Sequence, residues 1–143
     1  MSKVFYDKPI IDQIFEEINK NSGKHDIEKI TKLVERLPAE DVNTQYGING
    51  TILIEASLYG YIKIVKLLLE KGGIDVNIQD WLDSTALINA SINDHIEIVK
   101  LLLEKENIDI NIQNLYGRTA LNYAVQYDYP EIVKLLEDHK QTS

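Results

Sequence analysis

The feature that most constrains the fold of this chain is a sequence pattern that recurs every 34 residues. The tripeptide Asp-Val-Asn begins at Asp41 and Asp75, and its variant Asp-Ile-Asn begins at Asp109. In the same register, Thr-x-Leu recurs at positions 51, 85 and 119, and Ile-Val-Lys-Leu-Leu recurs at positions 64, 98 and 132. These recurrences predict three copies of one small unit, stacked in series so that each copy covers the apolar face of the next.

Each unit is predicted to contain two short helices and a polar turn. Thr51, Thr85 and Thr119 are suitable N-caps, because a hydroxyl accepts a hydrogen bond from a free N–H in the first helical turn. The apolar spacing that follows is helical. First helices are expected at about 51–59, 85–93 and 119–127, and second helices at about 61–71, 95–105 and 129–138.

The break between the two helices falls at Gly60, Asp94 and Asp128. Asp94 lies three residues before Glu97, as Asp128 lies three residues before Glu131, which is the spacing of a capping box. We therefore expect both aspartates to cap the second helix of their unit.

The two ends of the array are predicted to be polar on their outer faces. Glu137 stands where the inner units have Leu69 and Leu103. Before the repeats, an amphipathic helix at 9–20, a loop at 21–24 and a helix from 26 to about 37 form an N-terminal capping pair. The predicted organisation is one domain, 1–143, made of the cap (1–40), repeats at 41–74 and 75–108, and a C-terminal capping repeat at 109–143.

Composition excludes several classes of function. The chain has 143 residues, 44% of them hydrophobic, and no cysteine, so thiolate metal sites, disulfides and cysteine nucleophiles are absent. A net charge of -8 argues against nucleic acid and anionic membranes, which require clustered Lys and Arg. The first residues lack the apolar stretch of a signal peptide, and we expect an intracellular, cytoplasmic protein, with export as an effector not excluded.

The repeated pattern resembles the ankyrin repeat. The resemblance rests on the Asp-Val-Asn turn, the Thr-x-Leu-x-x-Ala helix start and the Ile-Val-Lys-Leu-Leu-Leu-Glu-Lys second helix. It implies an all-α solenoid of helix-turn-helix units with β-hairpin-like fingers. The family's usual Thr-Pro-Leu-His is replaced in all three units, so the resemblance does not extend to the inter-repeat hydrogen bonds of the family's histidine. We expect an array somewhat less stable than a consensus one.

Ankyrin-like proteins bind other proteins, and the resemblance implies a binding site on the concave side, formed by the fingers and the first helices. The exposed finger positions are predicted to be Gly47, Ile48, Gly50, Trp81, Leu82, Ser84, Leu115, Tyr116 and Arg118. The exposed ends of the first helices are predicted to be Leu58, Tyr59, Ile92, Asn93, Gln126 and Tyr127. Trp, Tyr and Arg carry much of the binding energy at interfaces. The alternative is that these side chains pack the fingers against one another.

Charge indicates the kind of partner. Residues 41–143 carry 8 basic and 15 acidic side chains, so the repeats hold nearly all of the negative charge. Asp75, Asp80 and Asp83 surround Trp81 and Leu82, which suggests an apolar anchor with an acidic rim and a basic partner protein. The alternative is that the acidic residues only keep the protein soluble.

No catalytic chemistry is indicated, and no cofactor or metal is expected. His25, His95 and His139 belong to different units, and no Gly-rich phosphate loop or metal-binding motif is present. The finger asparagines, Asn43, Asn77 and Asn111, match a position that is hydroxylated in some animal ankyrin-like proteins, although their role in the turn is enough to explain them.

Three functions are compatible with these features. The first is a non-enzymatic protein-binding module or scaffold, which we expect to be a monomer because no heptad pattern supports self-association. The second is a small acidic immunity protein or antitoxin that inhibits a basic toxin enzyme. The third is a host-directed bacterial or viral effector; the excess of Lys over Arg, 13 to 2, hints at an AT-rich genome without separating these sources.

Overall fold

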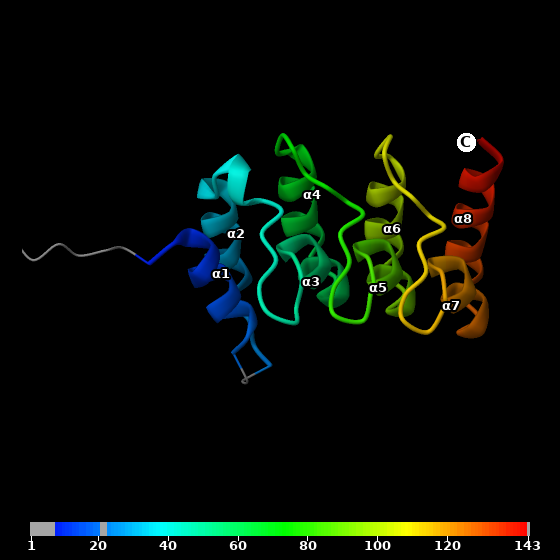
Figure 1. The fold of residues 1–143 in the computed structure, drawn as a ribbon, viewed down its shortest axis with the longest axis horizontal. Coiled ribbons are helices and arrows are strands. Elements are labelled where there is room, and N and C mark those ends of the chain that lie inside the picture. Colours follow the sequence, from blue (N-terminus) through cyan, green and yellow to red (C-terminus); the bar gives the residue numbers. More distant parts are fainter. Residues whose placement is uncertain (1–7, 21–22, 143) are drawn as a thin grey trace, which may run out of the picture.

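The fold is a single row of helix pairs, seen in a computed structural model that describes residues 8–20 and 23–142. The pairs follow one another along the long axis of the molecule, from α1 and α2 at one end to α7 and α8 at the other (Figure 1). No strand is found in the described part. The elements are α1 (Ile10–Ile18), α2 (Ile27–Arg36), the short 3-10 helix η1 (Ala39–Asp41), α3 (Ile52–Tyr59), α4 (Ile62–Glu70), α5 (Ala86–Ile92), α6 (Ile96–Leu103), α7 (Ala120–Gln126) and α8 (Pro130–Thr142).

The helices form two layers that share one continuous core. The first helices of the units, α3, α5 and α7, pack in sequence, and α2, α4, α6 and α8 pack in sequence behind them. The most deeply buried side chains come from both layers, for example Leu53 and Leu87 from the first helices and Leu68 and Leu102 from the second. The expected all-α solenoid is therefore confirmed.

The three threonine caps form as predicted. The hydroxyl oxygens of Thr51, Thr85 and Thr119 each accept a hydrogen bond from the N–H three residues further on, over 3.3, 3.2 and 3.2 Å. Asn122 returns the bond to the N–H of Thr119, which completes a capping box in the third unit. Most helices are one or two residues shorter than predicted at their ends, while α8 continues past residue 138 to Thr142.

The prediction that Asp94 and Asp128 cap the second helices is wrong. Both residues lie in the left-handed region, with φ of 56° and 57°, in the sharp turn between the helices. Aspartate tolerates this backbone conformation better than most residues. The capping boxes do not form, and Glu97 and Glu131 instead lie 3.4 and 3.7 Å from the Nζ of Lys100.

Gly60 occupies the corresponding turn in the first unit, with φ of 78°. A Cβ atom at this position would lie 2.7 Å from Cε1 of His95 in the next unit, which is closer than real Cβ contacts allow. His95 Nε2 lies 3.1 Å from the carbonyl oxygen of Leu58. The left-handed backbone favours glycine at this position, and the neighbouring imidazole leaves no room for the Cβ that the aspartates carry in the other two turns.

Finger asparagines link consecutive units. Asn43 donates from Nδ2 to the carbonyl oxygen of Gly73 over 2.7 Å and accepts from the N–H of Asp75 over 2.8 Å. Asn77 makes the equivalent two bonds, to the carbonyl oxygen of Asn107 over 2.6 Å and from the N–H of Asp109 over 2.9 Å. In each pair, the bond from the aspartate N–H is the one that joins one unit to the next. The bonds from the N–H groups of Asp75 and Asp109 therefore connect consecutive units whose first helices carry no histidine.

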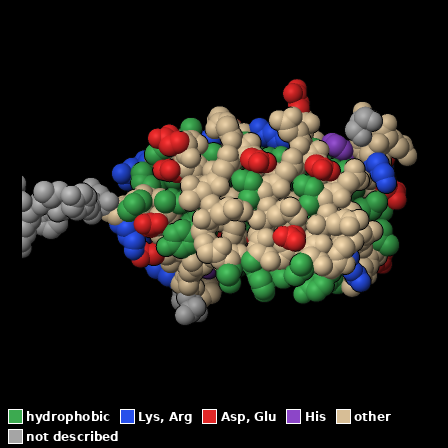
Figure 2. All heavy atoms as spheres, in the orientation of Figure 1, with side chains coloured by type: hydrophobic (Ala, Val, Ile, Leu, Met, Phe, Trp, Pro, Cys, Tyr) green, Lys and Arg blue, Asp and Glu red, His purple; other side chains and the backbone are tan. Residues whose placement is uncertain are grey.

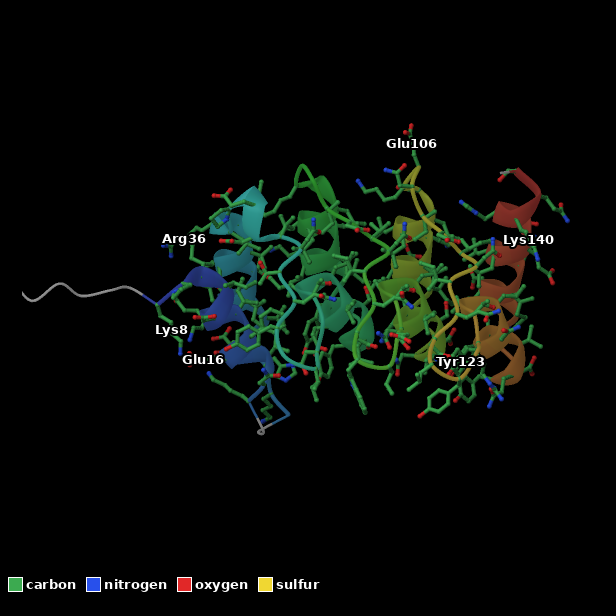
Figure 3. All side chains as sticks on the ribbon, viewed as in Figure 1. Lys8, Glu16, Arg36, Glu106, Tyr123 and Lys140 are labelled. Atoms are coloured by element: carbon green, nitrogen blue, oxygen red, sulfur yellow. The ribbon has the colours of Figure 1, made fainter. Side chains whose placement is uncertain are left out.

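The N-terminal helix pair is fastened by a buried carboxylate. Glu17 accepts from Lys20 Nζ over 2.5 Å and from the N–H of Asp26 over 3.2 Å, and Lys29 Nζ lies 3.3 Å away. These bonds, that to Lys20 foremost, lower the pKa of Glu17 to about 2 despite burial. Lys8 and Glu16 form a further ion pair on the outer face (Figure 3).

The division into a cap at 1–40 and repeats at 41–74, 75–108 and 109–143 stays a prediction. Part of the expected loop at 21–24 lies outside the described residues, as do residues 1–7.

The hydrogen bonds of Asn43 and Asn77 to the loops and N–H groups that follow them form an asparagine ladder along the fingers, and this ladder can be tested with a matched pair of variants. Asn77→Ala should lower the free energy of unfolding by about 1–3 kcal/mol, because it leaves two backbone groups without their partners. Asn111 occupies the same place in the third unit, and its side chain makes no hydrogen bond within the described residues. Asn111→Ala should therefore stay within about 0.5 kcal/mol of wild type. Urea unfolding followed by circular dichroism measures both; equal losses in the two variants would contradict the ladder.

Candidate functional site

The fingers are tight turns that present their tips to solvent. The N–H of residues 46, 80 and 114 donates to the carbonyl oxygen four residues further on, over 2.8, 2.9 and 3.0 Å. Asp80 Oδ1 fastens the second finger by accepting from the N–H groups of Leu82 and Ser84, over 2.9 and 3.0 Å. Asn114 does the same in the third finger, and the N–H of Leu115 donates to the carbonyl of Leu82 over 2.8 Å. The second and third fingers are thereby held to each other.

Large apolar side chains gather on these tips. Ile48, Trp81, Leu115 and Tyr116 are 64%, 62%, 62% and 67% exposed, and they come from three successive fingers. We call these four residues the finger patch. Figure 2 shows hydrophobic side chains along the lower edge of the molecule, the edge at which the finger turns lie in Figure 1. Among the remaining predicted finger residues, Arg118 is exposed, and Asp80 and Leu82 are half-buried.

Gly50 and Ser84 were expected on the finger surface, and this expectation is wrong. Both are buried, because their carbonyl oxygens close the turns of the first and second fingers. Gly50 is also in close contact with the next finger, since a Cβ atom there would lie 3.2 Å from Cβ of Asp80.

The predicted residues at the ends of the first helices fall into a separate group. Tyr59, Asn93, Gln126 and Tyr127 are exposed, whereas Leu58 and Ile92 are half-buried against the core. These residues lie at the turns between helices, so the expected site divides into two parts.

Aromatic rings cluster at two of these turns. Tyr59 stacks on Tyr61 with ring centroids 5.5 Å apart, and both rings meet the imidazole of His25 edge-on. His25 Nδ1 also contacts the hydroxyl of Tyr61. At the other end, Tyr127 packs against Tyr123 and Tyr129, with centroid distances of 6.1 and 5.9 Å.

A polar column that the sequence reasoning missed runs along the first helices. Glu55, Asn89 and Tyr123 are spaced by 34 residues on α3, α5 and α7, and all three are buried. We call them the inner column; Figure 3 labels Tyr123. The signal available in the sequence was a side chain with a polar group at the same register position, the fourth residue, of all three first helices.

Glu55 is the only member of the inner column with an ionisable carboxyl group, and it is buried. Its side chain is 7% exposed. Burial away from water raises the pKa of Glu55 to about 7, and the nearby negative charge of Asp80 adds to this effect. Within the described residues no group of three or more His, Asp or Glu side chains gathers to hold a metal ion.

The geometry first defines a class: a repeat solenoid of short helix pairs whose fingers display exposed apolar side chains. A family model described as "Ankyrin repeats (3 copies)" matches residues 79–142, and a second, "Ankyrin repeats (many copies)", matches residues 53–103. Together they span 53–142, more than half of the chain, and the chain belongs to the ankyrin-repeat family. Comparison with curated proteins gave no match.

Ankyrin repeats are generally protein–protein interaction modules and are typically not enzymes. The described part of the chain contains no helix that is both long and apolar enough to span a bilayer.

The raised pKa of Glu55 makes a prediction about stability. Between about pH 4.5 and 7 the folded protein holds a proton at Glu55 that the unfolded chain has lost, so this group makes the protein less stable as pH rises. Glu55→Gln removes the effect. The stability of Glu55→Gln relative to wild type should therefore rise by about 1–3 kcal/mol from pH 4.5 to pH 8. Urea titrations at several pH values measure this difference, and a difference that does not change with pH would contradict the assignment.

Proposed function

We propose that this protein is a non-enzymatic binding module that recognises another protein through its finger patch. The observation that carries the proposal is the set of four large apolar side chains, each more than half exposed, on three successive fingers. Leaving such side chains in water has a cost that burial against a partner removes. Trp and Tyr are also the side chains most often found where truncation reduces binding strongly.

The rigidity of the fingers supports this role. Backbone hydrogen bonds close each turn, and Asp80 and Asn114 fasten the second and third fingers from inside. A surface whose backbone is already ordered loses less conformational entropy when it binds. The exposed ends of the first helices, Tyr59 and Tyr127 among them, are proposed as a secondary contact at the margin of the site.

Charge favours a basic partner. Asp75 and Asp83 are exposed around the second finger, and the repeats hold most of the net charge of -8. A field of this sign speeds the approach of a basic protein and disfavours acidic ones. The same observation favours a second, more specific function, inhibition of a basic enzyme in the manner of an immunity protein or antitoxin. In either role we expect a cytoplasmic monomer.

The test is the double variant Trp81→Ala/Tyr116→Ala, used beside wild type to capture partners from a lysate of the source organism. Loss of two aromatic anchors should weaken a stoichiometric complex about 100-fold or more. Mass spectrometry identifies the captured protein, and calorimetry with the purified partner measures the affinity. A basic enzyme that loses activity on binding would support the inhibitor role.

Ile62→Ala/Val125→Ala is the matched control, because both side chains are exposed and apolar and neither belongs to the finger patch. The control should bind like wild type. A partner that is retained by the finger variant, or lost equally by both variants, would contradict the proposed site.

A further inference from the structure

Glu55 is a buried carboxyl group for which the protein supplies no counterpart. It lies in the middle of α3, where the adjacent Ile54 and Ala56 are also buried. Neither oxygen of its carboxyl group makes a hydrogen bond or ion pair within the described part of the chain. Burying a charged carboxylate without a partner is costly, so a position of this kind calls for an explanation.

The other members of the inner column show what is missing. Asn89 reaches the finger residue nine positions earlier, with Nδ2 3.5 Å from Oδ2 of Asp80. Tyr123 does the same, its hydroxyl accepting from Asn114 Nδ2 over 2.7 Å. The corresponding residue for Glu55 is Tyr46.

Tyr46 makes no hydrogen bond to Glu55 and packs instead against the N-terminal helix pair. Its ring stacks on Phe15 of α1, with centroids 4.6 Å apart and planes 7° from parallel. The packing of the first finger against the N-terminal helix pair therefore leaves Glu55 without the partner that its register provides in the other two units.

The charged group that acts on Glu55 is a second carboxylate, that of Asp80. Asp80 packs against Gly50 at the end of the first finger, where a Cβ atom on Gly50 would lie 3.2 Å from the Cβ atom of Asp80. Its Oδ1 is occupied by the finger N–H groups, while Oδ2 has only the long contact with Asn89. In the described ranges, no Lys, Arg or His forms an ion pair with Glu55 or Asp80. The other titratable groups that interact electrostatically with Glu55 are the hydroxyls of Tyr59 and Tyr61, which are neutral.

We propose that Glu55 and Asp80 together form a seat for one lysine or arginine side chain of a partner protein, between the first and second fingers. The inference rests on the proposed function and specifies the chemistry of the partner. Hydrogen bonds between a cation and carboxylates are among the strongest in proteins, and the single positive charge of a cation placed between Glu55 and Asp80 would offset the repulsion between the two carboxylates. The finger patch then supplies apolar contact beside a charged anchor.

The repeats themselves suggest the variant that tests this seat. Asn114 occupies the position of Asp80 in the third finger and fastens its turn through Oδ1, so Asp80→Asn should keep the second finger folded. Glu55→Gln keeps the shape of the side chain. The double variant Glu55→Gln/Asp80→Asn removes both charges, and Glu70→Gln, at an exposed position on α4, is the control for a lost surface charge.

The probes are Nα-acetyl-arginine amide, Nα-acetyl-lysine amide and Nα-acetyl-citrulline amide. The first two are cations, and the citrulline compound is neutral and has nearly the same shape as the arginine compound. Each is titrated into the protein of residues 1–143 at about pH 8, above the pKa of Glu55, and followed by ¹H–¹⁵N NMR. We expect a cationic probe to shift the amide resonances of Glu55, Asp80 and their neighbours. Its affinity should exceed that of the citrulline compound by about tenfold and fall by a similar factor in the double variant, but not in Glu70→Gln.

Two results would overturn the seat. One is an equal response to the arginine, lysine and citrulline compounds; the other is an undiminished response to a cation in a double variant that remains folded by circular dichroism. Trp81→Ala/Tyr116→Ala should bind the cationic probe as wild type does. A chain that fails to bind either cation, yet captures a partner through the finger patch, would refute the seat and leave the proposed function standing.

Discussion

Helices of seven to thirteen residues cannot bury their apolar faces in isolation, and everything else in this structure depends on contact between neighbouring units. One register position illustrates the dependence. Ser57 and Ser91, on α3 and α5, are completely buried by the unit that follows, whereas Val125, at the same place on α7, is 60% exposed. The helices of one unit pack on each other, and the core is completed only by contact with the next unit. The bonds from Asn43 and Asn77 to the N–H groups of Asp75 and Asp109 fix how consecutive units are placed.

This arrangement separates the residues that fold the chain from those available for binding. The apolar stripes of both helix layers are used in stacking, while the finger tips extend from the turns and carry little of the core. Trp81 and Tyr116 can therefore be large and exposed without disturbing the helices beneath them. Glu55 and Asp80 lie just inside this surface, so the proposed contact combines a broad apolar area with a charged position deeper in the stack.

Much of the fold was predictable because it repeats. Three occurrences of the same threonine in one register indicated three helix starts, and each forms. The errors came from features that a residue pattern does not encode. Asp94 has the spacing of a capping residue, but its left-handed backbone reflects the geometry of the turn. The finger tips were identified from register, whereas the raised pKa of Glu55 depends on its burial and on the charge of Asp80 in the next finger. Tyr46, the finger residue that corresponds to Asp80 in the register, stacks on Phe15 of a helix outside the repeats.

The contact between Gly60 and His95 has a consequence for how such a protein can evolve. The turn of one unit lacks a side chain, and the next unit places an imidazole in the space that results. The following two turns carry aspartate instead, at Asp94 and Asp128, so they do not offer the same space. The units are therefore not interchangeable parts. Duplicating, deleting or reordering one of them would require a matching change across the new junction, and the array is inherited as an ordered set.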